Sequence, residues 1–330
     1  SGNVIAVGSF QGSLLFDPNA STLDDSGNYD VFVAKFDAGG NPLWSKRFGD
    51  SSSQAASSVA TDATGNIYIA GSFDGTIDFG GGVSVSNLNT NQGFVVKLDP
   101  SGNASWAKSY GSVGGTSFTG VTVDADGYVI VVGTDNIGGS LGDLVIRKFL
   151  STGLQSWNVV VTAASGGQYA RAVATDASAN IYVTGSFDGA VTLGSTTLTP
   201  QGSDILVAKL DPAGSFLWAK GFGDPSSQAA GSVAVDGNGD VVLAGSMNGT
   251  LSFGGQTLAS AGAEDAFVAK LDSAGNHLMS RRFGDGAAQM IGRMAVDGGG
   301  GRQTAATPRW RRQRPRTSRV SPVSGGNRLA

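Results

Sequence analysis

Short runs rich in β-branched and aromatic residues alternate along this chain with clusters of Gly, Asn, Asp and Pro. In one representative stretch, the runs cover residues 57–62, 67–73, 94–98 and 104–110. Turn-forming residues separate them, as in the Asp-Pro-Ser-Gly-Asn segment at residues 99–103. Runs of this length and composition, bounded by such turns, predict four β-strands.

The same four-strand stretch is repeated five times. A glycine at the equivalent point of the second strand marks each copy, at Gly8, Gly71, Gly133, Gly185 and Gly245. The steps between these glycines are 63, 62, 52 and 60 residues. Self-similarity at a long period indicates a repeat architecture. Four antiparallel strands per unit, which cannot bury both faces alone, are typical of a β-propeller blade, so we predict an all-β propeller of about five four-stranded blades.

The composition of each strand predicts its place in the blade. The first strand of a unit is built mainly from Ala, Ser, Thr and Val, which suits the crowded innermost position. The last strand carries a large apolar residue that we expect to pack between blades, namely Trp44, Trp106, Trp157, Trp218 or Met279. Residues 291–297 resemble one more first strand. We expect them to pair with the N-terminal blade, residues 4–48, because closure of a ring removes free sheet edges.

Composition and charge narrow the possible functions. The 330 residues contain no cysteine, which excludes disulfides, cysteine-ligated metals and a thiol nucleophile. Eight arginines and no acids lie in residues 302–330, which leaves 14 bases against 26 acids, a net charge of −12, in residues 1–301. An acidic body does not favour nucleic acid. No apolar run approaches the roughly 20 residues of a membrane span.

The arginine-rich segment departs from the repeat pattern and has no periodicity of its own. We therefore expect a propeller domain over residues 1–300 and a disordered, non-native tail over residues 301–330. The chain begins within a unit and without an initiator Met. Any signal or anchor sequence is expected to lie outside it.

The loops that precede the first strands contain the clearest candidate site. Each of three loops delivers an Asp and a Gln close to the propeller axis. The candidate ligand-binding residues are Asp50, Gln54, Asp224, Gln228, Asp285 and Gln289. A ring of such groups at a channel mouth would bind a polar ligand or a cation. The alternative, which we favour, is structural: the Asp caps its own loop and the Gln satisfies backbone groups of the next blade.

Two arginines, Arg171 and Arg293, interrupt the small residues of the innermost strands and are candidates for binding an anion near the axis. The Asp-x-x-Gly turns at the other ends of the strands predict Asx turns with a left-handed glycine. They do not predict calcium loops, because those need about six oxygen ligands and usually a distant Glu. His277 is the single histidine. We therefore expect no metal and no cofactor.

The unit pattern Asp-x-Phe-Val-Ala-Lys-Leu-Asp-x-x-Gly-Asn-x-Leu-Trp-x-Lys-x-Phe-Gly-Asp resembles the SBBP family of bacterial β-propeller repeats. The fit is close at residues 30–50, 204–211 and 265–272, and the resemblance extends over residues 1–297. Unit three departs most, since it has Leu150 in place of the Asp and lacks Phe-Gly-Asp. The resemblance implies a secreted or surface-exposed bacterial protein. It transfers no catalytic residues, because the family has no established activity.

Together these features favour a non-catalytic repeat scaffold that presents a loop face to a protein or carbohydrate partner, outside the cell or at the bacterial surface. The alternative is a hydrolase or lyase with a carboxylate-based site at the channel mouth. An enzyme should gather unequal, titratable residues at the axis. The small side chains of the innermost strands favour the scaffold.

Overall fold

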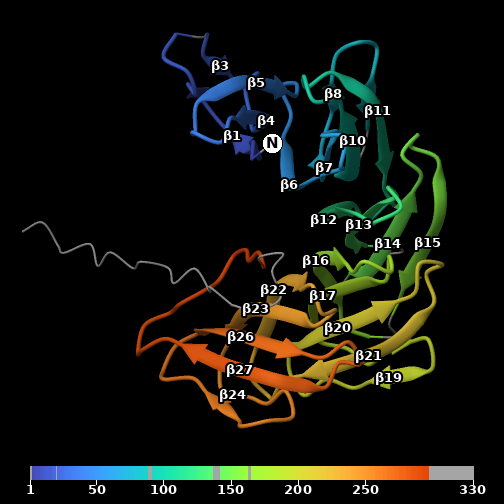
Figure 1. Cartoon of the computed structure of the whole chain (residues 1–330), viewed down its shortest axis with the longest axis vertical. Helices are drawn as coiled ribbons and strands as arrows, with labels where there is room; N and C mark the ends of the chain where they lie inside the picture. Colours follow the sequence, from blue (N-terminus) through green and yellow to red (C-terminus); the bar gives the residue numbers. More distant parts are fainter. Residues whose placement is uncertain (1, 20, 88–90, 137–141, 163–164, 297–330) are drawn as a thin grey trace, which may run out of the picture.

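The computed structural model describes residues 2–19, 21–87, 91–136, 142–162 and 165–296. Throughout these ranges the regular elements are β-strands, and the larger sheets follow one another along an arc (Figure 1). Within the described segments there is no helix with the length and hydropathy needed to span a bilayer. The all-β prediction is therefore confirmed for the described residues.

Each repeat unit forms one antiparallel sheet, here called a blade. Blade one contains β1 (Val4–Phe10), β4 (Asp30–Phe36) and β5 (Pro42–Phe48). Blade two contains β6 (Gln54–Thr61), β7 (Ile67–Phe73), β10 (Gln92–Leu98) and β11 (Ala104–Tyr110). Blade three contains β12 (Thr116–Val123), β13 (Val129–Asp135), β14 (Asp143–Phe149) and β15 (Gln155–Val161).

Blade four contains β16 (Gln168–Thr175), β17 (Ile181–Phe187), β20 (Asp204–Leu210) and β21 (Phe216–Phe222). Blade five contains β22 (Gln228–Val235), β23 (Val241–Met247), β26 (Asp265–Leu271) and β27 (His277–Phe283). In the described residues, small hairpins join the two middle strands of blades two, four and five, and the equivalent strands β1 and β4 of blade one. They are β2–β3 (Ser13–Leu14, Leu23–Asp24), β8–β9 (Thr76–Asp78, Ser84–Ser86), β18–β19 (Val191–Leu193, Thr196–Leu198) and β24–β25 (Thr250–Leu251, Leu258–Ala259).

The first strands β6, β12, β16 and β22 contact one another in succession and form the inner wall of the arc. Each contains a bulge at the same point, which leaves one residue without a pairing partner: Ser57, Thr119, Arg171 or Gly231. The recurrent glycine of the second strand lies beside this bulge. A Cβ on Gly71 would overlap the carbonyl oxygen of Ala55, and equivalent overlaps occur in blades three to five. Close backbone approach therefore requires the repeated glycine.

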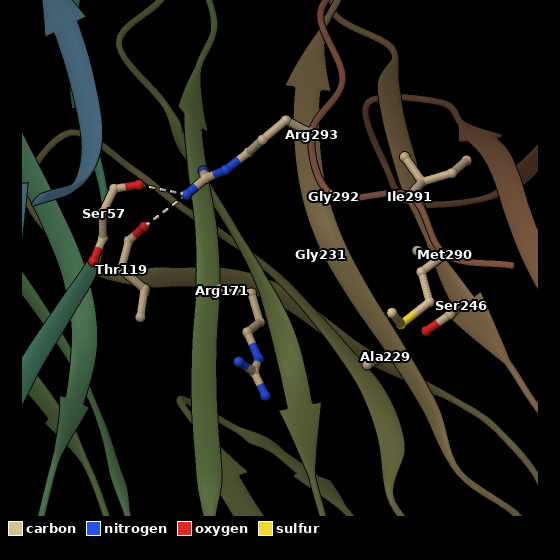
Figure 2. A pocket seen from close by; sticks show the side chains of 11 residues that line it. Ser57, Thr119, Arg171, Ala229, Gly231, Ser246, Met290, Ile291, Gly292 and Arg293 are labelled. Atoms are coloured by element: carbon tan, nitrogen blue, oxygen red, sulfur yellow. Dashed lines mark hydrogen bonds between the residues drawn. The ribbon is translucent and has the colours of Figure 1, made fainter. Parts of the chain in front are cut away.

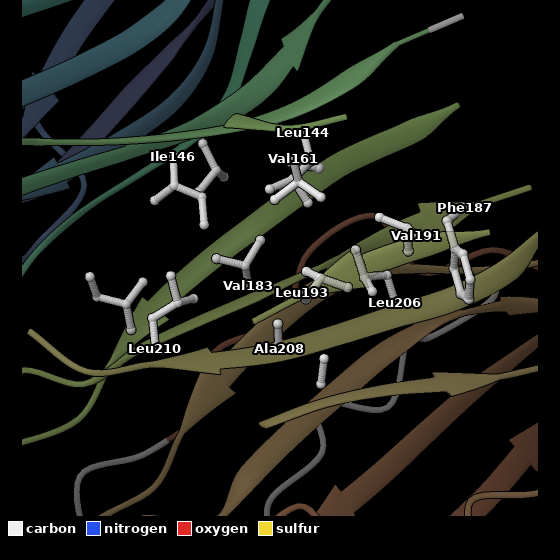
Figure 3. Close-up of a cluster of buried hydrophobic side chains, with 14 of the residues drawn as sticks. Leu144, Ile146, Val161, Val183, Phe187, Val191, Leu193, Leu206, Ala208 and Leu210 are labelled. Atoms are coloured by element: carbon white, nitrogen blue, oxygen red, sulfur yellow. The ribbon is translucent and has the colours of Figure 1, made fainter. Parts of the chain in front are cut away.

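The hydrophobic core lies between neighbouring blades. Every residue of β17 and β20 is buried, because both faces of a middle strand are covered by adjacent sheets. Figure 3 shows one cluster, to which blade three contributes Ile146 and Val161 and blade four contributes Val183, Phe187 and Leu206. Burial of this apolar surface is the main force that holds one blade against the next.

Hydrogen bonds also connect neighbouring blades at their outer edge. A Lys of the third strand and the Trp of the fourth strand donate to one carbonyl oxygen of the next blade's turn, at 2.8 to 3.4 Å. The donor pairs and acceptors are Lys35 and Trp44 to Pro100, Lys97 and Trp106 to Ser151, Lys148 and Trp157 to Pro212, and Lys209 and Trp218 to Ser273. The predicted position of the tryptophans between blades is confirmed.

The predicted closing strand is not observed. Residues 291–296 adopt no strand, and in the described part of the chain β1 pairs with β4 alone. The segment instead lies against the inner wall: the Met294 N–H donates to Ser232 Oγ at 3.1 Å, and Arg293 reaches blades two and three. The closed five-blade ring therefore stays a prediction. The domain boundary at residue 300 and the tail lie outside the described residues.

Candidate functional site

The Asp50–Gln54 pair lies in the connection from β5 to β6. Gln54 is buried, and its Nε2 donates to Asp50 Oδ1 at 2.7 Å and to the carbonyl oxygen of Asp74 at 2.9 Å. Its Oε1 accepts the Asp50 N–H at 3.2 Å. The side chain that was a candidate ligand-binding group thus has its donors and its acceptor engaged within the protein.

In two of the pairs, the aspartate also accepts a hydrogen bond from a neighbouring hairpin. Asp50 Oδ2 accepts the N–H of Thr76, the first residue of the β8–β9 hairpin, at 2.7 Å. Asp224 Oδ2 accepts the N–H and the hydroxyl of Thr250, the first residue of β24–β25, at 2.6 and 2.7 Å. In both blades one carboxylate therefore fixes the start of its hairpin. The structural interpretation of these loops agrees with this geometry.

Hydrogen bonding also determines the protonation of these carboxylates. Burial acts to raise the pKa of Asp224, but hydrogen bonds from Thr250, Ser226 and Gln228 outweigh it and lower the pKa to about 2. The pKa of Asp50 is lowered for the same reasons, with burial opposing hydrogen bonds from Ser52, Thr76 and Gln54. Both groups are therefore ionised at neutral pH and cannot serve as general acids there.

The third predicted pair, Asp285 and Gln289, forms after blade five. Gln289 Nε2 donates to Asp285 Oδ1 at 2.8 Å, and Gln289 Oε1 accepts the Asp285 N–H at 3.1 Å. The Gln289 N–H donates to the carbonyl oxygen of Glu264 at 2.7 Å. Each Asp is thus placed beside its own Gln. Among the described residues, no group of three or more His, Asp or Glu side chains has a metal-binding arrangement.

One buried glutamine at the start of an innermost strand, Gln168, was not among the residues predicted from the sequence. Gln168 occupies in β16 the position of Gln54 and Gln228 and is fully buried, but the loop before it lacks Phe-Gly-Asp. Among the described residues its Oε1 and Nε2 have no hydrogen-bond partner. The available signal was a Gln at the start of the innermost strand without the aspartate four residues earlier.

The two predicted arginines line the same cavity at the inner wall. Its volume is about 380 Å³, and it is lined by Ser57, Thr119, Arg171, Ala229, Gly231, Gly245, Ser246, Met290, Ile291, Gly292 and Arg293. Figure 2 shows Arg293 reaching across the cavity toward Ser57 and Thr119, while Arg171 extends from β16 with its guanidinium turned away from Arg293. The lining includes no carboxylate. The structure therefore brings Arg171 and Arg293 together, apart from the Asp–Gln pairs.

The Asx turns predicted for the opposite end of the strands are confirmed. Asp37 Oδ1 accepts the N–H groups of Gly39 and Asn41, both at 2.8 Å, and Gly40 has a φ of +83°. Asp62 makes the same turn and also accepts the Tyr68 hydroxyl at 3.1 Å. In these described turns the carboxylates accept hydrogen bonds from backbone N–H groups of their own turn.

Repeated antiparallel sheets of three or four strands, packed face to face around an inner wall, define a repeat scaffold of the β-propeller class. The SBBP family, described as a beta-propeller repeat, matches residues 43–84. This range runs from β5 of blade one through β6, β7 and β8 of blade two to the first residue of β9. The resemblance stated from the sequence is confirmed there.

Two curated proteins are similar to parts of the chain. One, from Acanthamoeba polyphaga mimivirus, is an uncharacterized WD repeat-containing protein, L264, 32% identical over 121 residues, which cover 34% of this chain and 8% of that protein. The other is the regulatory protein FlaEY of Caulobacter vibrioides, 25% identical over 281 residues, which cover 74% of this chain and 29% of that protein. The chain thus spans well under half the length of either relative.

Proposed function

We propose that this chain is a non-catalytic binding scaffold that presents its hairpin face to a protein partner, outside the cell or at the bacterial surface. The hairpin face comprises β8–β9, β18–β19 and β24–β25. The observation that carries the proposal is the fixation of two of these hairpins by Asp–Gln pairs whose Gln is buried. A fixed backbone loses little conformational entropy on binding, so it favours recognition.

The hairpins also expose side chains that differ between blades. The exposed positions include Asp78 and Ser84 on β8–β9 and Thr192 and Thr197 on β18–β19. Loops held on a rigid scaffold commonly carry binding residues. Similarity to a WD repeat-containing protein supports a repeat scaffold, while the location outside the cell rests on the SBBP resemblance. The carboxylates required by the hydrolase or lyase alternative are engaged in holding loops.

Site-specific photo-crosslinking tests this proposal. A photoreactive residue would be placed at Thr197 on the hairpin face, and at Ala213 in a turn at the other end of the same blade as the matched control. Both positions are exposed. In extracts of the source organism, we expect Thr197 to cross-link one protein reproducibly and Ala213 to cross-link none. Equal labelling from both positions would contradict the proposal. Binding of the chain to a glycan array tests the separate expectation of a carbohydrate partner.

A further inference from the structure

The bulges of the inner wall create the cavity at the axis. The four bulged residues, Ser57, Thr119, Arg171 and Gly231, all line it. Because a bulged residue is left out of strand pairing, its backbone and side chain are available to the space beside the sheet. Three of these four bulged residues have small side chains, which leaves space in the cavity. Of the four, only Arg171 carries a charge.

The second arginine of the cavity is held in place by the backbone. Arg293 Nη2 donates to the carbonyl oxygen of Ser57 at 2.7 Å and to that of Thr119 at 3.3 Å (Figure 2). A guanidinium carries five N–H donors, so further donors remain for another group. Arg171 is exposed and has no hydrogen bond or ion pair within the described residues. The cavity therefore holds two positive charges and no negative one in its lining.

The remainder of the lining is mostly apolar. Ala229, Met290 and Ile291 line the cavity opposite the bulges of blades two and three (Figure 2). The cavity of about 380 Å³ lies within the range of small-molecule sites, which combine apolar walls with a few polar groups. A ligand that fits has one anionic group and a small apolar body. Planar carboxylates match the guanidinium fork especially well.

We propose that this axial cavity binds a small organic carboxylate. Arg171 pairs with the carboxylate group, and Met290 and Ile291 contact the apolar body. This site is separate from the hairpin face, so a negative result for carboxylate binding does not affect the proposed protein partner, and the reverse also holds. Inorganic phosphate would use the arginines and leave the apolar wall empty, which makes phosphate a discriminating probe.

The test measures binding of benzoate, benzyl alcohol and inorganic phosphate to the full chain by calorimetry or ligand-observed NMR. We expect benzoate to bind with a dissociation constant on the order of 1 mM. Benzyl alcohol and phosphate should each bind at least tenfold more weakly. The proposal would be overturned if benzyl alcohol bound as well as benzoate or if phosphate bound more tightly. It would also be overturned if no benzoate binding were detected at a benzoate concentration of about 20 mM.

Variants locate the binding. Arg171→Met should weaken benzoate binding at least tenfold, while Arg281→Met, at an exposed arginine of β27 outside the cavity lining, should leave it unchanged. Gly231→Val fills the cavity without changing its charge, and an added Cβ there meets its nearest neighbour at an ordinary 3.4 Å. Loss of benzoate binding with an unchanged circular dichroism spectrum is expected for this variant. Wild-type affinity in either cavity variant would contradict the proposed site.

Discussion

Gln228 and Gln168 occupy equivalent buried positions but differ in their partners, so the same substitution should have opposite effects. Gln228 Nε2 donates to Asp224 Oδ1 at 2.6 Å and to the Asn248 carbonyl oxygen at 2.8 Å, and its Oε1 accepts the Asp224 N–H at 3.2 Å. Gln168 has no side-chain partner among the described residues. Methionine has the same length and no amide, which makes Gln→Met the appropriate change.

The magnitudes follow from the bonds. A neutral hydrogen bond contributes about 1 kcal/mol and one to a charged group about 1.5–3 kcal/mol, so Gln228→Met should lower the free energy of unfolding by about 3 kcal/mol. Gln168→Met removes two buried polar atoms without partners, and should raise the free energy of unfolding by about 1–3 kcal/mol. The two side chains share no hydrogen-bond partner among the described residues, so the double variant should show additive effects.

Chemical denaturation of the two variants and the double variant measures these changes, and thermal melting gives an independent check. We expect the midpoint of Gln168→Met to rise and that of Gln228→Met to fall relative to wild type. A decrease of equal size in both variants would refute the reasoning, because it would mean that the amide of Gln168 is as well satisfied as that of Gln228.

Three further predictions follow from local geometry. Ala179 has a φ of +58° where the other turns have glycine, so Ala179→Gly should raise the free energy of unfolding by about 0.5–1 kcal/mol. Gly127 has a φ of +82°, so Gly127→Ala should lower the free energy of unfolding by about 1–2 kcal/mol; chemical denaturation measures both changes. Hydrogen bonds from Asn66, Thr64 and Tyr68, opposed by burial, lower the pKa of Asp62 to about 2 from an ordinary 3.8. The stability from Asp62 is therefore complete above pH 3.8 and lost as the pH falls through about 2, a loss that Asp62→Asn should reduce in melting curves recorded against pH. Trp218→Phe removes the 3.1 Å hydrogen bond to Ser273 and should cost about 1 kcal/mol in denaturation; no change would contradict a tie between blades.

The fold was largely predictable because its determinants are local. Strand runs, turn residues and the repeated glycine all occur within single units, so residues 67–73 and 104–110 were predicted with the bounds that the structure shows. The reason for the glycine was not predictable. Gly71 is needed because the β6 bulge brings a carbonyl oxygen against it, and a bulge depends on the pairing of two strands.

The candidate site was predictable in part. The pairing of Asp50 with Gln54 spans four residues, and its structural interpretation followed from the repeated motif. The contact of Arg293 with Ser57 joins groups 236 residues apart. Such a contact depends on how the arc is arranged, which the residues of one unit do not specify. The lack of a partner for Gln168 among the described residues had a local signal, since no aspartate lies four residues before it, but its full burial depends on the packing of the blades.

Amide hydrogen exchange at Thr250 tests most directly the claim that Asp–Gln pairs fix the hairpins as a binding face. Its N–H donates to Asp224 Oδ2 at 2.6 Å, so the amide should be protected in the wild-type chain. Removing this charge-assisted bond in Asp224→Ala should speed exchange by about tenfold to a hundredfold while the amides of β23 and β26 stay protected. Exchange at Thr250 at the rate of an unfolded peptide in the wild type, or no acceleration in the variant, would contradict the account.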